Sequence, residues 1–231
     1  MQKPGEEGYD KRFERLRPDG ILARHLGAVE HFRRNAHAET VHGDFSLNAT
    51  NALTARTLLG LGLSTLTPAY DLDLTQLLDL CAGVPVSRLE VTIHQHLPLF
   101  HNEHCVYSHL LSNGHDFRDC GRPCERHLVK LRDALGMEHP VIVDVGCRNT
   151  VFNARAQSAA SCFPTLLALG VRRFRVELVR ETAAETKRVL SAYSDLLRGA
   201  RTPKSVIQEV GALEKYGVSA GTLTVVTQPH A

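Results

Sequence analysis

Short strand-like and helix-like segments alternate along much of this chain, and this alternation is the strongest constraint on its fold. Apolar runs rich in β-branched residues and leucine are each followed by a stretch in which apolar side chains recur at helical spacing. In the helix predicted over 71–81, for example, Leu74, Leu77, Leu78 and Cys81 lie on one face. The predicted strands are 20–26, 42–48, 64–70, 88–94, 140–145 and 172–179, and the predicted helices are 28–34, 52–61, 71–81 and 181–197.

Strands that alternate with helices at short spacing favour a parallel sheet covered by helices. A closed barrel needs eight such units, whereas about six can be counted here. We therefore predict an α/β fold, a partial (β/α)8 TIM-type barrel over 20–199, between a polar leader (1–19) and a C-terminal tail (200–231). Segment 96–139 interrupts the rhythm and is rich in His, Cys and Gly, so we expect a functional loop insertion there.

Overall charge excludes some partners. The chain has 231 residues, 43% of them hydrophobic and 23% charged, with a net charge of only +2. These values are typical of a globular protein with a core, and no global field attracts nucleic acid or anionic membrane. The segment from Arg118 to Arg180, however, contains eleven Lys and Arg but only six Asp and Glu. This local excess is as consistent with an ordinary solvated surface as with a phosphate-binding face.

No targeting or membrane segment is expected. A membrane-spanning helix needs roughly 18 or more apolar residues in a row, and no such run occurs. The polar, charged N-terminus lacks the apolar region of a secretory signal. We therefore expect a cytoplasmic protein, in which clustered cysteines indicate metal binding or catalysis more often than disulfides.

Four of the six cysteines are clustered. Cys105, Cys120, Cys124 and Cys147 follow the spacing C-x14-C-x3-C-x22-C. Cys120 and Cys124 enclose Gly-Arg-Pro, which favours a tight turn that aims two thiolates at one point, and Cys147 follows a predicted strand. Four thiolates suit a tetrahedral zinc ion or an iron–sulfur cluster. Because no C-x2-C pair is present, an iron–sulfur cluster is slightly favoured over zinc, and four buried or unpaired thiols are the alternative to any metal.

The other two cysteines and the common catalytic motifs do not indicate a further functional site. Cys81 continues the apolar face of its helix and Cys162 precedes a potential helix start at Pro164, so both are interpreted as core or loop residues. His101-Asn-Glu-His104 is one residue short of the zinc-protease patterns H-E-x-x-H and H-x-x-E-H. Neither a G-x-S-x-G nucleophile elbow nor a glycine-rich phosphate loop is present.

The segment from Glu90 to Ser108 resembles the signature of the peptidase U32 family, also called collagenase-like proteases. That signature reads E-x-F-x2-G-[SA]-hydrophobic-C-x4-G-x-C-x-hydrophobic-S. Signature positions are matched without a gap by Glu90, Leu97, Cys105 and Ser108, and others are changed, including those at Thr92, Gln95, Pro98 and Glu103. Further segments resemble the family: Asp119-Cys-Gly-Arg-Pro-Cys124, Asp144-Val-Gly-Cys-Arg-Asn-Thr-Val-Phe-Asn153 and Gly170-Val-Arg-Arg-Phe-Arg-Val-Glu177.

The resemblance covers about 20–198 and implies a (β/α)8-type barrel whose first strands are missing here, in a divergent member. It implies a [4Fe–4S] cluster, for which Cys105, Cys120, Cys124 and Cys147 are the four available ligands although Pro98 replaces the first signature cysteine. Zinc is the alternative cofactor. Members of the family resemble enzymes that hydroxylate a pyrimidine in tRNA or rRNA, and paralogues act in ubiquinone hydroxylation.

Three functions follow from the resemblance. The first is cluster-dependent hydroxylation of RNA or a related small molecule, with RNA or a small carboxylate as substrate. The second is the peptidase activity of the family name, and the third is a non-catalytic subunit whose protein partner completes the barrel. For hydroxylation, we predict that Arg122 and Arg148, with Arg126 and Arg155, bind phosphate or a carboxylated donor. Glu90 and Glu177, on predicted strands, would act as acid or base or form structural ion pairs.

Overall fold

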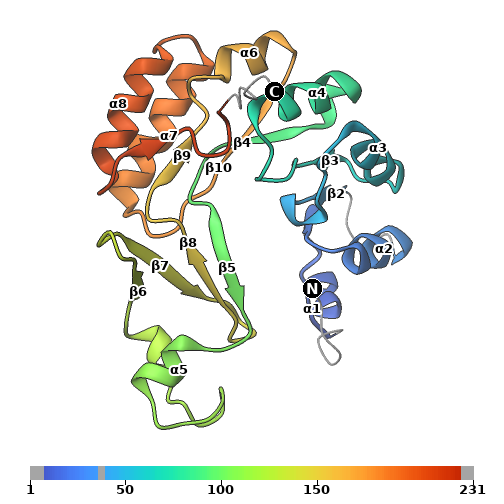
Figure 1. The fold of residues 1–231 in the computed structure, drawn as a ribbon. Coiled ribbons are helices and arrows are strands. Elements are labelled where there is room, and N and C mark those ends of the chain that lie inside the picture. Colours follow the sequence, from blue (N-terminus) through green and yellow to red (C-terminus); the bar gives the residue numbers. More distant parts are fainter. Residues whose placement is uncertain (1–7, 36–39, 225–231) are drawn as a thin grey trace, which may run out of the picture. The chain divides into compact units, whose positions relative to one another are not determined.

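The computed structural model describes residues 8–35 and 40–224. The chain forms two compact units, whose helices and strands are labelled in Figure 1. The first comprises Met1–Ile93, Ser161–Arg175 and Ala220–Ala231, and the second comprises His94–Ala160 and Val176–Ser219.

The first unit contains the predicted alternation of strands and helices. Strands β1 (Gly20–Ala23), β2 (Thr40–Gly43) and β3 (Thr65–Leu66) form a parallel sheet in chain order. They alternate with α2 (Leu26–Asn35), α3 (Ala52–Gly60) and α4 (Leu74–Gly83). A parallel bridge between Leu66 and Leu89, at the end of η2 (Val86–Arg88), leads from β3 to the start of β4 (Glu90–Gln95).

Local sequence explains where these helices begin. The Asn51 side chain accepts a hydrogen bond from the backbone of Thr54 at the start of α3. Asp73 and Gln76 form a reciprocal capping box at the start of α4, which satisfies two backbone N–H groups that lack a partner within the helix. Helix α6 (Phe163–Ala168) begins after Cys162, as the proline near its start predicts. Its Phe163 and Leu166 are fully buried.

Close packing in this unit also requires glycine at one position. A Cβ on Gly43 would lie 2.7 Å from side-chain carbons of Leu63 and Leu66. Both leucines are completely buried, so they have no free space into which to move. The end of β2 therefore approaches the core at a distance that only glycine allows.

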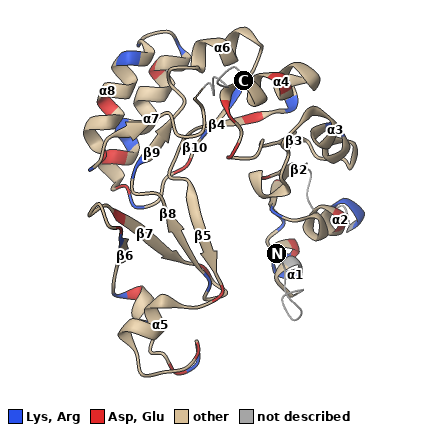
Figure 2. Ribbon diagram, viewed as in Figure 1, with Lys and Arg blue, Asp and Glu red and all other residues tan. Residues whose placement is uncertain are grey.

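The second unit contains a small antiparallel sheet and two long helices. The sheet has the order β5 (Pro98–Asn102), β8 (Asn149–Phe152), β7 (Glu138–Val143) and β6 (Val129–Arg132). Helices α7 (Ala183–Leu197) and α8 (Pro203–Leu213) pack side by side and carry charged residues of both signs (Figure 2). Helix α5 (Val106–Leu111) supplies Tyr107, which packs with Val141 and Val151 in a small core.

A further sheet has the order β10 (Arg173–Val176), β4, β9 (Ala156–Ser158) and β11 (Val218–Ser219). Strands β4 and β9 are antiparallel, with His94 opposite Ser158 and Gln95 opposite Gln157. Strands β9 and β11 are parallel. The end of β4 therefore places His94 inside the sheet of the second unit.

The mixed α/β class is confirmed, whereas a closed barrel is not found among the described strands. Segment 96–139, predicted as a loop insertion, instead contains β5, α5, η3 (Pro123–Glu125) and β6. The prediction overlooked the alternation of apolar and polar residues in Val129–Arg132, which is typical of a strand exposed on one face. The C-terminal end of the β4 segment thus leads into a small sheet.

Some predicted boundaries also differ. The strand predicted over 42–48 ends at Gly43 and continues as η1 (Phe45–Leu47), and the one predicted over 64–70 is reduced to Thr65–Leu66. The predicted leader contains α1 (Gly8–Leu16), and the predicted tail contains α8. The remainder of those predictions, 1–7 and 225–231, lies outside the described residues. No helix within the described ranges is long and apolar enough to cross a membrane.

Candidate functional site

The four clustered cysteines lie on local turns of the second unit. Cys105 precedes α5, Cys120 ends a turn, Cys124 lies within η3, and Cys147 lies in the loop between β7 and β8. All four are free and half-buried.

The turn between Cys120 and Cys124 has the shape that its sequence predicts. Gly121 and Arg122 adopt left-handed backbone conformations, with φ of 64° and 49°. Pro123 then starts the short helix η3. Two successive left-handed residues reverse the chain within one turn, so Cys120 and Cys124 come from opposite arms of it.

The loop that carries Cys147 is held by Asp144. The Asp144 carboxylate accepts hydrogen bonds from the backbone of Gly146 at 2.8 Å and of Arg148 at 2.9 Å. Cys147 itself has a φ of 62°. A non-glycine residue in this region is uncommon and costs free energy. A cysteine in a position that favours glycine indicates that the thiol has a role of its own.

The four thiols converge. Burial, followed by the neighbouring thiols of Cys105, Cys120 and Cys124, raises the pKa of Cys147 above its ordinary value. Such an effect requires sulfur atoms close enough to interact electrostatically. Cys105 and Cys124 also pack against the buried cluster of Tyr107, Val141 and Val151. The thiols of Cys105, Cys120 and Cys124 therefore lie within electrostatic reach of Cys147.

The spacing of these sulfurs bears on the choice between zinc and a cluster. A tetrahedral zinc ion with Zn–S bonds of about 2.3 Å requires sulfurs about 3.8 Å apart. Groups of three or more His, Cys, Asp or Glu whose ligand atoms all lie within 4.8 Å of one another could hold a metal ion. Within the described ranges the only such group is His94, Glu181 and Glu214. No three of the described cysteine sulfurs lie that close to one another.

The other cysteines pack as expected. Cys81 and Cys162 are 1% and 5% exposed. Burial raises the pKa of the Cys81 thiol to about 11, so it is protonated at neutral pH. Both cysteines belong to the core of the first unit.

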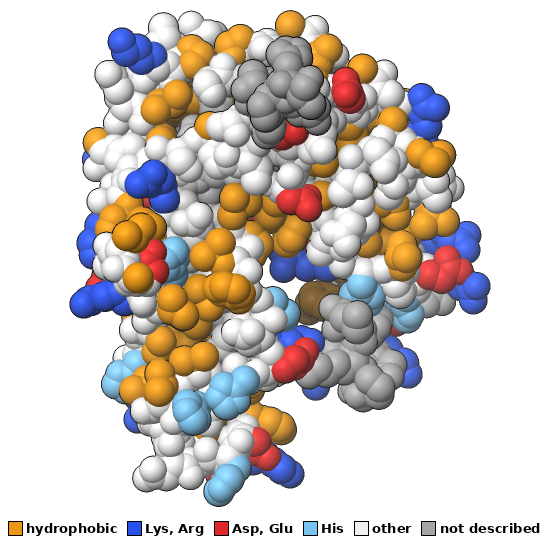
Figure 3. Space-filling view, in the orientation of Figure 1, with side chains coloured by type: hydrophobic (Ala, Val, Ile, Leu, Met, Phe, Trp, Pro, Cys, Tyr) orange, Lys and Arg blue, Asp and Glu red, His pale blue; other side chains and the backbone are white. Residues whose placement is uncertain are grey.

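The two predicted anion-binding arginines differ in exposure. The Arg122 side chain is 69% exposed and pairs with Glu125 at 3.3 Å. The Arg148 side chain is only 14% exposed and pairs with Asp144 at 2.9 Å. Arg122 is therefore the more accessible of the two, whereas Arg148 braces the loop of Cys147. Histidine side chains gather on the surface near α5 (Figure 3), where the rings of His104 and His109 are 5.1 Å apart.

The two predicted acid–base glutamates lie in different units. Glu90, in the first unit, accepts a 2.5 Å hydrogen bond from Arg175, which also pairs with the buried Asp44 at 2.6 Å. Glu177, in the second unit, donates its backbone N–H to the carbonyl of His94 at 2.8 Å. Glu90 thus has the ion pair that the structural alternative predicts. An acid–base role for either residue stays a prediction.

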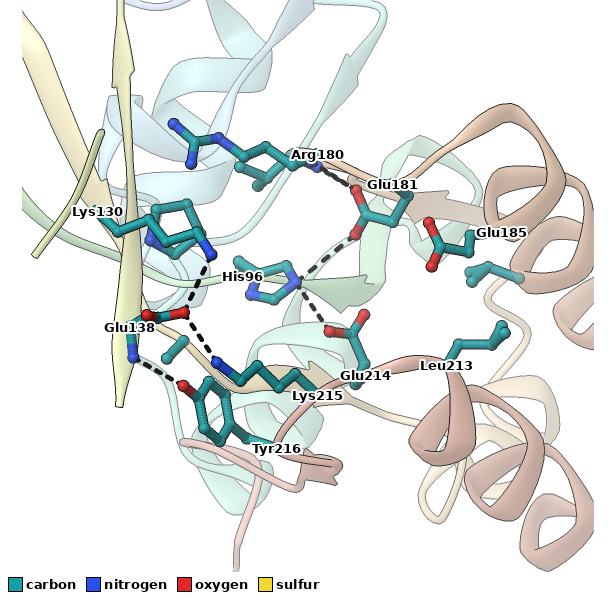
Figure 4. Close-up of a pocket in the computed structure, with 14 residues that line it drawn as sticks. His96, Lys130, Glu138, Arg180, Glu181, Glu185, Leu213, Glu214, Lys215 and Tyr216 are labelled. Atoms are coloured by element: carbon teal, nitrogen blue, oxygen red, sulfur yellow. Dashed lines mark hydrogen bonds and ion pairs between the residues drawn. The ribbon is translucent and has the colours of Figure 1, made fainter. Parts of the chain in front are cut away.

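A second cluster of polar residues, which the sequence did not indicate, lines a pocket of about 190 Å³ in the second unit (Figure 4). His96, just beyond β4, points toward the carboxylates of Glu181 and Glu214 at 3.6 and 3.5 Å. Glu181 lies just before α7, and Glu214 lies directly after α8. The pocket is therefore built by the end of a strand and by the ends of two helices.

Burial and close contacts shift the pKa values in this pocket strongly. Burial by itself would lower the pKa of His96. Its contacts with Glu181, Glu214 and the carbonyl of Asn153 nevertheless raise this pKa to about 10. Burial lowers the pKa of His94 to about 4, so its imidazole is neutral at neutral pH. Although burial opposes it, His96 and two backbone N–H groups lower the pKa of Glu181 to about 2.

The cations around this pocket have other partners. Lys130 and Lys215 bind Glu138 at 3.0 and 2.8 Å, as Figure 4 shows. The Arg180 guanidinium donates to the backbone carbonyls of Val129 and Val141. Within the described part of the chain, none of these three side chains forms a hydrogen bond or ion pair with the carboxylates of Glu181 or Glu214.

Comparison with known families identifies the chain. The sequence model of peptidase family U32 matches residues 6–219 of the 231. The protein belongs to peptidase family U32. The match extends over both units and over all four clustered cysteines. Searches of curated proteins and of solved structures found no match.

Membership of the U32 family confirms the resemblance predicted from the signature. In this U32 protein Pro98, which replaces the first signature cysteine, begins β5. The sequence did not indicate His94, His96, Glu181 and Glu214 as a site. The available signal was the i, i+2 spacing of two histidines at a strand end, which places them on one face.

Proposed function

We propose that this U32 protein holds a [4Fe–4S] cluster on Cys105, Cys120, Cys124 and Cys147 and acts in cluster-dependent hydroxylation of RNA, tRNA or rRNA, or of a related small molecule. The observation that carries the proposal is that all four thiols are free and half-buried, and that those of Cys105, Cys120 and Cys124 lie near enough to Cys147 to add to the effect of burial in raising its pKa. When bound, the cluster supplies electron transfer.

The protein's own residues support this role by shaping the site. The left-handed turn at Gly121 and Arg122 and the left-handed backbone of Cys147 would orient thiols from separate segments toward the cluster. The buried side chains of Tyr107, Val141 and Val151 cover one side of Cys105 and Cys124. Such apolar packing limits access of water to the sulfurs, which is one way a protein tunes a cluster.

Substrate binding is assigned to exposed arginines near this end of the unit. Arg122 carries a largely exposed guanidinium beside the cysteine turn, and planar guanidinium groups bind phosphate or carboxylate with two hydrogen bonds. Arg148 would contribute mainly by holding its loop. We further propose that the parallel run from β1 to β4 is part of a family barrel, which a protein partner could complete.

The test starts with protein purified without oxygen from cells grown with iron. Iron, acid-labile sulfide and visible absorption are measured for the wild type and for four variants, each with one clustered cysteine changed to alanine. We expect about four irons and four sulfides per chain for a [4Fe–4S] cluster, with loss in each variant. Cys81→Ala and Cys162→Ala are the matched controls and should keep the cluster. Zinc without sulfide would refute the proposal.

Activity is then examined by mass spectrometry of nucleosides from RNA incubated with the protein, a reductant and an oxygen donor, and from cells with and without the gene. A hydroxylated pyrimidine that depends on Cys147 supports the proposal. Cleavage of gelatin that survives cluster loss would instead support the peptidase of the family name. A stable complex with a second protein, with no activity of the isolated chain, would support the partner-subunit alternative.

A further inference from the structure

The pocket formed by the end of β4 and the ends of α7 and α8 contains converging ligand atoms. One nitrogen of His94 and one carboxylate oxygen each of Glu181 and Glu214 lie within 4.8 Å of one another. These residues come from three distant parts of the sequence and are held by separate elements. A converging set of imidazole nitrogen and carboxylate oxygen is the donor set of a divalent transition-metal ion.

His94 is oriented as metal-binding histidines are. It is completely buried, and its Nδ1 lies 3.3 Å from the Tyr193 hydroxyl, which in turn bonds the Ser158 hydroxyl at 2.7 Å. When Nδ1–H donates to Tyr193, the lone pair of Nε2 faces the pocket. That Nε2 has no hydrogen-bond partner, and its nearest carboxylate oxygen, on Glu214, is 3.9 Å away.

Glu181 is held in the same way. One of its carboxylate oxygens accepts the backbone N–H groups of Val179 at 2.6 Å and of Arg180 at 2.9 Å. The other oxygen, Oε1, is buried without a hydrogen-bond partner. The side chain is only 9% exposed. A buried carboxylate oxygen that lacks a donor is costly, and it is aimed at the same point as Nε2 of His94.

His96 lies beside this set, with its Nε2 3.6 Å from Glu181 and 3.5 Å from Glu214. Its Nδ1 lies 2.7 Å from the backbone carbonyl of Asn153, so Nδ1–H donates there and Nε2 faces Glu181 and Glu214. A backbone carbonyl that fixes the tautomer of a ligating histidine is a common feature of metal sites. Nε2 of His96 can ligate an ion only when that ion displaces the proton from this nitrogen.

We propose that His94, His96, Glu181 and Glu214 bind one divalent first-row transition-metal ion, at a site that shares no ligand with the four cysteines. Two imidazoles and two carboxylates suit Zn²⁺, Fe²⁺ or Mn²⁺ better than Ca²⁺ or Mg²⁺, which prefer oxygen ligands alone. The ion neutralises the buried carboxylates and joins the end of β4 to the ends of α7 and α8.

The test uses Mn²⁺, because this hard ion binds nitrogen and oxygen ligands and avoids thiolates. Purified full-length protein is dialysed against chelator and titrated with Mn²⁺, and the electron paramagnetic resonance signal of free Mn²⁺ is measured. We expect one bound ion per chain, displaced by Zn²⁺ in accordance with the usual order of affinity. A thermal melt should shift upward when the ion is added.

Variants locate the ion. Glu214→Gln, which keeps the shape of the side chain, and His94→Gln should each weaken Mn²⁺ binding at least about tenfold, by analogy with the loss seen when second-shell partners are removed. Glu185→Gln is the matched control, since Glu185 lines the same pocket but caps α7 through Thr182, a role that glutamine also fills. Circular dichroism verifies that each variant folds. His94 is the more buried of the two residues, so if His94→Gln does not fold, the Mn²⁺ affinity of Glu214→Gln tests the proposal.

Cys147→Ala separates this proposal from that of the cluster, because it should remove iron and sulfide yet leave Mn²⁺ binding unchanged. Absence of stoichiometric Mn²⁺ binding by the wild type would overturn the second metal site. Equal binding by wild type and Glu214→Gln, or equal loss in Glu185→Gln, would do the same. None of these outcomes bears on the iron and sulfide content that tests the cysteine site.

Discussion

Replacing Cys147 by glycine and, separately, by alanine tests whether the loop between β7 and β8 holds its thiol in a strained backbone. Both variants lack the sulfur, so both should lose the cluster to the same extent. They differ in the backbone, because Cys147 has a φ of 62°. The left-handed region costs an L-residue roughly 1–2 kcal/mol, whereas glycine adopts it freely but loses about 0.5–1 kcal/mol of chain entropy on folding.

The two terms predict that the metal-free glycine variant is more stable than the alanine variant by about 1 kcal/mol. For a chain of this length such a difference corresponds to a Tm higher by about 2–4 °C. Urea unfolding and calorimetry of protein treated with chelator, both without oxygen, measure it. The metal-free glycine variant should also exceed the wild type in stability, while the wild type alone should bind iron.

Cys124 is the matched control for this comparison. It lies in η3 and is not among the residues with positive φ. At that position glycine should be less stable than alanine, by about 0.5–1 kcal/mol, so the sign reverses between the two sites. If Cys147→Gly and Cys147→Ala unfold together, the backbone at this position is not left-handed and the reasoning from strain is wrong.

Three other changes address the pocket and the core. Lys215, Lys130 and Arg132 lower the pKa of Glu138 to about 2. The ionised Glu138 therefore contributes stability above its ordinary pKa of 4.5, and this contribution is lost as the pH falls through 2. Denaturant titrations should show Glu138→Gln less stable than wild type at neutral pH and equal to it near pH 2. Tyr193→Phe removes the hydrogen-bond acceptor for Nδ1 of His94 and should weaken Mn²⁺ binding by about 10–100-fold. Circular dichroism should show little loss of helix. An unchanged Mn²⁺ affinity would contradict the proposed orientation of His94. Leu166→Ala leaves a cavity in the core of the first unit and should lower the free energy of unfolding by about 2–5 kcal/mol, whereas Leu53→Ala, at a site 77% exposed, should change it by less than about 0.5 kcal/mol.

Local patterns predicted the elements whose signals lie within a few residues. The helical spacing of Leu74, Leu77 and Cys81 and the cap at Asp73 account for α4, and Pro164 accounts for the start of α6. The small antiparallel sheet was missed because β5, β6 and β8 are short and half-exposed, so each has too few apolar residues to stand out. The partial TIM-type barrel is not confirmed, because a count of strands says nothing about which strands pair.

The same division applies to the candidate sites. The sequence by itself determined the four-cysteine set and the turn at Gly121, because spacing and turn residues act locally. Only the tertiary structure places the thiol of Cys105 near that of Cys147, and the carboxylates of Glu181 and Glu214 near the imidazole of His94. Those placements depend on strand pairing and on the packing of α7 against α8, which bring together residues far apart in the chain and which no local pattern encodes.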